Sequence, residues 1–418
     1  MVEMTYMTKF FIAFICLKGL IESYLDNRNK MHILKNRKEV PAKFSDQITL
    51  EDHQKAADYS VTKIKAAQLF NLIGYGVLLA WTLGGGLDYL NTHVKTLGLS
   101  QLWTGVVFFL AFSFINSIIT MPETLYKTFV IEEKFGFNKT TAKTFITDMI
   151  KGLALGLIIG VPILAGILWI MDALGEYWWA YAWAFLSVVQ LLLMWIYPTF
   201  IAPLFNKFSA LEDGEVKDKI LELLKRTGFE SNGLFVMDAS KRSGHGNAYF
   251  TGFGKNKRIV FFDTLIDTLE PSEVEAVLAH ELGHFKRKHV LKLMIKAFLF
   301  SFLGLFILGQ LMKADWFFNG HGVSSNETYM ALILFTMVSG IYTFFITPIS
   351  AWTSRKYEFE ADEFAANNSD AADLISALVK MYKDNASTLT PDPAYSAFYH
   401  SHPPALIRVN FLEKFLKK

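Results

Sequence analysis

The chain has 418 residues, of which 52% are hydrophobic and only 19% are charged. Soluble domains average about 45–50% apolar and about 25% charged residues, so this composition excludes a disordered chain and indicates a membrane protein. The net charge of +2 gives no overall basic field, so no nucleic-acid partner is expected, and the single cysteine, Cys16, excludes intrachain disulfides and cysteine-built metal sites.

Seven stretches are long and apolar enough to predict membrane-spanning helices, each of which needs about 20 residues. In chain order they are 6–24, 66–88, 101–122, 152–172, 177–198, 291–312 and 328–350. No A-x-A-like cleavage site follows the first stretch, which favours a retained anchor over a signal peptide. Lys292 and Lys296 interrupt the start of the sixth, where long lysine side chains can reach the interface.

Lysine and arginine gather in alternate loops between these stretches. The first and third loops are rich in them, whereas the second offers only Lys95 and the sixth only Lys313. Short loops with positive charge stay in the cytoplasm. The pattern therefore predicts an integral membrane protein whose N-terminus lies outside, with residues 199–290 and 351–418 both in the cytoplasm.

Four segments follow from this division. Residues 1–204 hold the first five transmembrane helices with their cytoplasmic loops, and 205–290 form a cytoplasmic segment with a protease motif. Residues 291–350 hold the last two transmembrane helices. Residues 351–418 form a C-terminal cytoplasmic segment that packs against the second one and completes its site.

The segment before the sixth span carries the motif H-E-x-x-H. Apolar residues run at helical spacing from 274 to 282 after Pro271, so His280 and His284 lie one turn apart on one helix face. Two imidazoles at this spacing can both bind zinc, and the intervening Glu281 is placed to take a proton from the attacking water. Chance can also produce the pattern, but the helical context favours a zinc site.

A catalytic zinc needs a third protein ligand, and the helix-like stretch after the seventh span offers one. Glu358 and Asp362 are one turn apart there. Glu358 would complete a His2Glu site, and Asp362 would accept the second N–H of a ligating imidazole and fix its tautomer. Glu360 and Glu363 point to other faces and are expected to be solvated.

In these motifs the sequence resembles the type I CAAX prenyl endopeptidases, which are integral-membrane gluzincin-like zinc metalloproteases. The resemblance covers nearly the whole chain and includes runs far from the HExxH motif. These runs are Tyr126 to Lys139 (YKTFVIEEKFGFNK), Tyr197 to Phe208 (YPTFIAPLFNKF), Ser240 to Phe250 (SKRSGHGNAYF), Lys255 to Val260 (KNKRIV), Glu358 to Asp362, and Tyr399 to Pro404 (YHSHPP). Bacterial heat-shock membrane metalloproteases share the zinc motifs but fewer of these runs.

The resemblance implies that His280, His284 and Glu358 bind one zinc ion. It implies that Glu281 is the general base and that Asp362 is a catalytic or orienting acid, of which we favour orientation. It also implies a mainly α, polytopic membrane fold with about seven transmembrane helices, arranged as an α-barrel that encloses a water-filled chamber. A cytoplasmic zinc metalloprotease domain with a small β-sheet closes this chamber.

A β-hairpin is predicted from residues 247–253 and 258–263. Its edge strand would hold an extended peptide by backbone pairing beside the zinc, with Asn247 or His245 contacting a substrate carbonyl. The alternative is a strand that only packs under the HExxH helix, and it has more weight for His245 than for Asn247.

His402 precedes a final amphipathic helix that carries Arg408. By resemblance this His-Pro element lies close to the metal, where a catalytic imidazolium or a substrate-binding arginine would stabilise an oxyanion. A histidine that only closes a loop before proline is the alternative. His289 lies too far round the HExxH helix to share the metal face, and we interpret it as structural or solvated. Such roles are also expected of His32, His53, His93, His321 and His400.

These features predict a zinc endopeptidase that cleaves a peptide or protein substrate near the membrane face. By resemblance the substrate ends in a prenylated cysteine followed by three residues, and the enzyme removes this tripeptide. One alternative is a bacterial quality-control metalloprotease without prenyl substrates. Another is a non-catalytic chamber that binds or transports lipid-linked peptides, against which the intact Glu281 argues.

The connection from Asp267 to Ser272 lacks the acidic insertion expected of a eukaryotic member. The C-terminal Lys417-Lys418 is also not placed as a dilysine retrieval signal. We therefore expect a bacterial member of the family in the inner membrane, with the endoplasmic reticulum membrane as the alternative. No oligomeric state is predicted.

Overall fold

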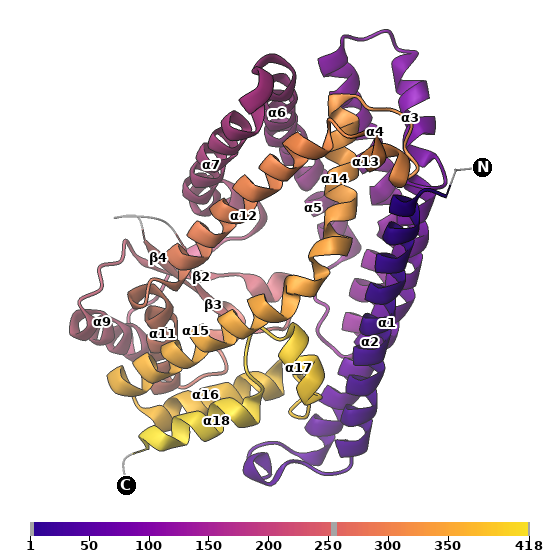
Figure 1. Ribbon diagram of the computed structural model, residues 1–418. Coiled ribbons are helices and arrows are strands. Elements are labelled where there is room, and N and C mark those ends of the chain that lie inside the picture. The colour runs from indigo at the N-terminus through magenta and orange to yellow at the C-terminus, as the bar shows by residue number, and fades with distance from the viewer. Residues whose placement is uncertain (1–3, 252–256, 417–418) are drawn as a thin grey trace.

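The computed structural model describes residues 4–251 and 257–416, and it is mainly helical (Figure 1). Figure 1 shows α1 and α2 as one long pair, α6 and α7 on the opposite side, and α12 and α14 between them. The helices of this part are α1 (Tyr6–Asn36), α2 (Leu50–Trp81), α3 (Gly86–Lys95), α4 (Gln101–Tyr126), α5 (Ala142–Leu155), α6 (Val161–Ala173), α7 (Trp178–Ile196), α8 (Ala202–Phe205), α12 (His289–Leu311), α13 (Asp315–Gly320) and α14 (Thr328–Thr343).

Six continuous helical segments within the described ranges are long and apolar enough to cross a membrane. They are Leu50–Trp81, Gln101–Glu132, Ala142–Ala173, Gly175–Phe205, His289–Leu311 and Thr328–Asn368. Each contains most or all of one predicted span. The predicted span 66–88 ends early, at Trp81, because the chain turns through Gly85, whose φ of 77° favours glycine. The mainly α, polytopic membrane fold is confirmed, whereas the enclosed chamber stays a prediction.

The first predicted span, 6–24, lies within α1, but α1 is not among these six segments. Its apolar residues are interrupted by charged ones about one turn apart. Lys18 and Glu22 form an ion pair of 2.9 Å, and both contact the hydroxyl of Tyr75 on α2. α1 therefore meets α2 partly through polar groups, and these charged residues make α1 less apolar than the six spanning segments.

A small mixed sheet stands beside the zinc motif. Its strands are β1 (Phe208–Ala210), β2 (Leu234–Met237), β3 (Ala248–Thr251) and β4 (Arg258–Phe262), in the order β1-β2-β4-β3. β3 and β4 pair antiparallel, which confirms the predicted hairpin, although its connection at 252–256 lies outside the described residues. β2 and β4 run parallel, and β1 is antiparallel to β2. β3 is thus an edge strand.

The helix with the HExxH motif is α11 (Pro271–Lys286), and it begins where the sequence predicts. Pro271 occupies its first turn, and Glu270 and Glu273 form a capping box that satisfies the free N–H groups of that turn. Glu273 also accepts hydrogen bonds from Ser376 and Lys380 of α16. The other helices of this part are α9 (Glu215–Thr227), α10 (Asp263–Ile266), α15 (Thr347–Asn368), α16 (Ala371–Asp384), α17 (Pro393–Tyr399) and α18 (Ala405–Leu412).

α11 lies at the centre of a hydrophobic core shared by the sheet, α9, α15 and α16. Leu278 and Leu282 of α11 are fully buried against Phe261 of β4 and Leu223 of α9. On its opposite side α11 packs closely on α15. A side chain at Gly283 would lie 2.8 Å from the Cα atom and 3.0 Å from the carbonyl oxygen of Ala361. The two helices can approach this closely only because residue 283 has no side chain.

We expect Gly283→Ala to push α11 and α15 apart. Overpacking of this kind typically costs about 1–3 kcal/mol, and it should also lower the zinc content of the purified protein. Thermal unfolding in detergent and metal analysis measure the two effects. Gly152→Ala on α5 is the control, because nothing lies within 4 Å of the added carbon there. An unfolding temperature and zinc content equal to those of the control would contradict the close packing.

Candidate metal centre

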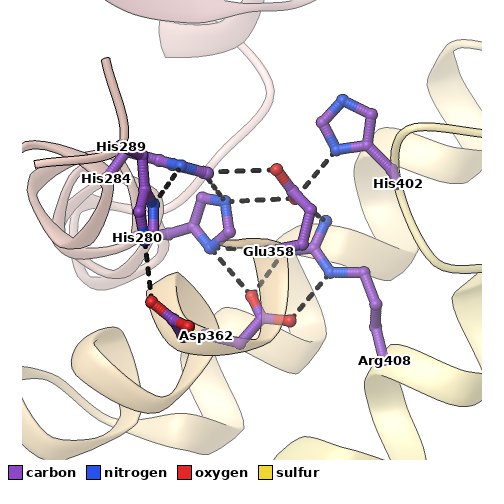
Figure 2. Close-up of polar contacts among 8 residues, drawn as sticks. His280, His284, His289, Glu358, Asp362, His402 and Arg408 are labelled. Atoms are coloured by element: carbon purple, nitrogen blue, oxygen red, sulfur yellow. Dashed lines mark hydrogen bonds and ion pairs between the residues drawn. The ribbon is translucent and has the colours of Figure 1, made fainter. Parts of the chain in front are cut away.

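The three predicted zinc ligands come together from α11 and α15 (Figure 2). The Nε2 atoms of His280 and His284 are 3.2 Å apart. Glu358 Oε1 lies 3.2 Å from His284 Nε2, and Glu358 Oε2 lies 3.5 Å from His280 Nε2. Donor atoms of the three residues all lie within 4.8 Å of one another. The i, i+4 spacing on α11 and the packing of α15 thus direct three donor atoms to one point.

This donor set fits a zinc ion. Glu358 Oε2 is buried and accepts no hydrogen bond from any described residue. His402 Nδ1 lies 2.8 Å from this oxygen but not in hydrogen-bonding geometry. A buried carboxylate oxygen that accepts no hydrogen bond is unfavourable, and a bound cation compensates for this loss. Two imidazole nitrogens and a carboxylate also form the His2Glu set that holds zinc in hydrolytic enzymes.

Asp362 contacts His280 at the ring nitrogen that does not face Glu358. It is completely buried, and its Oδ1 lies 2.8 Å from His280 Nδ1. Arg408 Nη2 also lies 3.3 Å from this nitrogen, but the arginine already donates two hydrogen bonds to Asp362. An ionised carboxylate only accepts, so His280 donates from Nδ1 to Asp362, and Nε2 is the atom that is available to a metal ion. This is the contact that the sequence predicted for Asp362.

Arg408 neutralises this buried carboxylate. Its Nε donates to Asp362 Oδ2 at 2.9 Å, and its Nη2 donates to Oδ1. Only 6% of Arg408 is exposed, and its Nη1 lies 3.7 Å from Glu358 Oε2. Two of the donor atoms of Arg408 are thus engaged by Asp362, next to the metal ligands. Direct contact between Arg408 and substrate stays a prediction.

Burial and the neighbouring carboxylates shift the pKa values of His280 and Arg408 in opposite directions. Burial lowers the pKa of His280, but the neighbouring carboxylates of Asp362 and Glu358 outweigh this effect and raise the pKa to about 9. Burial also lowers the pKa of Arg408, whereas the carboxylates of Asp362 and Glu358 raise it above its usual value. Arg408 therefore keeps its charge, and a metal ion competes with a proton for His280.

Glu281 faces a cavity that also reaches the metal ligands. The cavity has a volume of about 760 Å³, and Glu281, His280 and Glu358 line it together with α2, α16 and the loop 399–404. His402 belongs to this loop, and 64% of its side chain is exposed. A peptide in the cavity can thus approach both Glu281 and the metal ligands.

His245 and Asn247 line the same cavity beside the edge strand β3. The His245 ring stacks on Phe137 with 4.4 Å between ring centres, and its Nε2 lies 3.4 Å from Glu132 Oε2. Asn247 is exposed and accepts a hydrogen bond from the N–H of Ala248. His245 is therefore held by its own neighbours, while Asn247 lies open to the cavity.

His289 and Glu360 are two site residues whose contacts the sequence interpretation missed. His289 Nδ1 lies 3.0 Å from His284 Nδ1, and His289 Nε2 lies 3.0 Å from Glu360 Oε2. Only 1% of His289 is exposed, so a solvated role for it is wrong, and so is the expectation that Glu360 is simply solvated.

The physical reason is a break in the helix. α11 ends at Lys286, and Lys288 adopts a left-handed conformation with φ of 58°, so His289 begins a new helix and turns back toward His284. Left-handed residues are usually glycine or asparagine, and a lysine at this position gives no such signal.

A polytopic helical fold that carries this site defines an integral-membrane zinc metallopeptidase. Family models for the N-terminal part of CAAX prenyl proteases, with five membrane helices, and for peptidase family M48 match residues 30–207 and 210–416. The chain belongs to family M48 and is a membrane zinc metalloprotease of the CAAX prenyl protease type.

Curated relatives and a solved structure agree with this assignment over the full length. A CAAX prenyl protease 1 homolog of Arabidopsis thaliana is 37% identical, with 96% of each chain covered. CAAX prenyl protease 1 of Saccharomyces cerevisiae is 35% identical, over 94% of this chain and 92% of the relative. The crystal structure of S. mikatae Ste24p has 34% identity and a TM-score of 0.89, and the match covers 98% of this chain and 99% of that one.

We expect Asp362→Asn to lower both the zinc affinity and the stability of the protein, although Asp362 is not itself a zinc ligand. The amide leaves the buried Arg408 unpaired, which typically costs about 3–5 kcal/mol, and it loses the charge that fixes His280. Loss of such a supporting group typically lowers metal affinity about 10–100-fold. Zinc competition with a chelator and thermal unfolding measure these effects.

Asp213→Asn is the control, because Asp213 pairs with Lys217 on the surface with 95% of its side chain exposed. Zinc affinity in Asp362→Asn equal to that of the control would exclude the orienting role.

Proposed function

We propose that the chain removes the C-terminal tripeptide that follows a prenylated cysteine in a protein or peptide. The observation that carries the proposal is an HExxH metal centre with an accessible Glu281, in a chain whose full-length relatives are named CAAX prenyl protease 1. A lipid on the substrate explains why the peptidase site stands beside membrane helices, since the lipid remains in the bilayer while the peptide enters the cavity.

The mechanism assigns the chemistry to named side chains. When bound to His280, His284 and Glu358, zinc supplies a Lewis acid that polarises the scissile carbonyl and lowers the pKa of the attacking water. Glu281 takes a proton from this water as general base and passes it to the leaving amine. Asp362 accepts a hydrogen bond from His280 Nδ1 throughout the reaction. It therefore orients a metal ligand and does not donate a proton to the substrate.

The substrate peptide is proposed to lie along β3. An edge strand has free N–H and C=O groups that pair with an extended peptide. Asn247 would donate its side-chain amide to a substrate carbonyl at the start of that strand, with His245 as the neighbouring alternative. His402, exposed in the cavity beside Glu358, would stabilise the oxyanion as an imidazolium.

The metal centre is proposed to face the cytoplasm. The lysine-rich first and third loops and the lysine-poor second and sixth loops support this orientation, with the N-terminus on the other side. The short connection between α10 and α11, residues 267–270, supports the inner membrane of a bacterium. The eukaryotic relatives support the alternative, the endoplasmic reticulum membrane.

We expect Glu281→Gln to keep zinc and lose turnover. A general base typically contributes about 10²- to 10⁴-fold to the rate, and glutamine cannot take the proton. The assay compares a farnesylated CAAX peptide with the same peptide without lipid and with an unmodified membrane-protein fragment. Wild type should cleave the farnesylated peptide best, at the bond after the modified cysteine.

Glu275→Gln is the matched control on the same helix, because Glu275 pairs with Arg226 and does not line the cavity. Equal turnover by wild type and Glu281→Gln would refute the metallopeptidase mechanism. If only the unmodified fragment is cleaved, the prenylated substrate is refuted and a quality-control protease that cleaves membrane proteins is the better assignment.

The orientation can be tested with single cysteines, because Cys16 is the one cysteine of the chain. On a Cys16→Ser background, Lys38→Cys lies in the first loop and Leu97→Cys in the second. An impermeant maleimide applied to intact bacterial cells should label Leu97→Cys and should label Lys38→Cys only after the cells are opened. The reverse pattern would put the metal centre outside.

A further inference from the structure

A chain of three side chains leads away from the zinc ligand His284. His284 Nδ1 lies 3.0 Å from His289 Nδ1 (Figure 2). His289 Nε2 lies 3.0 Å from Glu360 Oε2. His289 is the first residue of α12, and Glu360 lies on α15 between Glu358 and Asp362. His284 therefore contacts the first residue of α12, whereas His280 contacts Asp362 of α15.

The position of every proton in this chain follows from Glu360. An ionised carboxylate can only accept a hydrogen bond, so His289 Nε2 carries the proton that points to Glu360. Neutral His289 then has its lone pair on Nδ1, and this atom must accept from His284 Nδ1. His284 is thereby left with its lone pair on Nε2, the atom that lies 3.2 Å from both Glu358 Oε1 and His280 Nε2.

The packing around His289 leaves its ring little freedom to turn. Its ring is stacked on Tyr357 with 4.2 Å between ring centres and 9° between planes. Two lysines of α12, Lys292 and Lys296, lie over the same tyrosine ring at 5.3 and 5.5 Å from its centre. Glu360 has a weak additional partner in Lys356, at 4.0 Å. Only 1% of His289 is accessible, so its ring nitrogens are shielded from water.

We propose that His289 and Glu360 are positioning residues that select the Nε2-ligating tautomer of His284 and strengthen it as a zinc ligand. A carboxylate that accepts through an intervening imidazole raises the electron density on the ligating nitrogen, as a directly bonded carboxylate does. The metal centre then depends on where α12 leaves α11, since His289 reaches His284 only through the left-handed turn at Lys288.

The test uses three variants of the full-length protein in detergent. His289→Phe keeps the ring stacked on Tyr357 but removes both hydrogen bonds. His289→Gln can still accept from His284 and donate to Glu360. Glu360→Gln keeps an acceptor for His289 but removes the charge. The control is Glu363→Gln, which lies on the same helix and pairs with Arg287 at the surface.

We expect zinc affinity, measured by chelator competition, to fall about 10–100-fold in His289→Phe, to fall less in Glu360→Gln and to be largely restored in His289→Gln. The visible spectrum of the cobalt-substituted protein should shift in His289→Phe and Glu360→Gln but not in Glu363→Gln. In the peptidase assay kcat should fall while KM stays unchanged. Only this last readout rests on the proposed function.

Zinc affinity and cobalt spectra of His289→Phe equal to those of Glu363→Gln would overturn the proposal. So would an equal loss in His289→Phe and His289→Gln, because that result indicates packing and not hydrogen bonding. If His289→Phe does not fold, Glu360→Gln decides, and an unshifted cobalt spectrum there overturns the proposal. If wild type cleaves no peptide, the proposed function fails while the metal readouts still decide this inference.

Discussion

The metal centre depends on the contact between α11 and α15, which meet at a residue without a side chain. Gly283 lies between His280 and His284 on α11, and Ala361 lies between Glu358 and Asp362 on α15. Because the side chain of residue 283 is a single hydrogen atom, the two backbones approach closely enough for donor atoms of the three ligands to lie within 4.8 Å of one another. A larger side chain at this point would separate the two halves of the site even if every ligand were retained.

α15 belongs to a segment that is long and apolar enough to span the membrane, and α11 directly precedes another, so the site lies next to the bilayer. The segment Thr328–Asn368 forms one continuous helix that crosses the membrane and then presents Glu358 and Asp362. α11 passes into α12 through the single left-handed residue Lys288. The two halves of the centre therefore lie next to membrane helices, one at the end of the segment Thr328–Asn368 and the other just before α12 (Figure 1).

The sequence predicts best what is local. His280 with His284, and Glu358 with Asp362, are one helical turn apart, so helical periodicity alone puts each pair on one face. Contacts that depend on tertiary structure were not accessible in the same way. Arg408 contacts Asp362 although it lies 46 residues further along the chain. The contact of His289 with His284 was also not predictable, because a helix that continued through Lys288 would direct His289 away from His284. The prediction of a span in α1 differs from the structure for another reason. Lys18 and Glu22 of α1 pair with each other and with Tyr75, so this helix is less apolar than the six spanning segments.

The three ligands are stabilised in three different ways, and this difference has a consequence for metal binding. His280 is fixed by a buried carboxylate that Arg408 neutralises, so its support remains satisfied with or without an ion. His284 is fixed through the neutral His289, whose charge partner Glu360 is partly exposed. Glu358 has a buried oxygen that no described residue satisfies. An ion therefore supplies a direct partner for Glu358 Oε2, while the two imidazoles are already oriented and lose little further freedom when it binds.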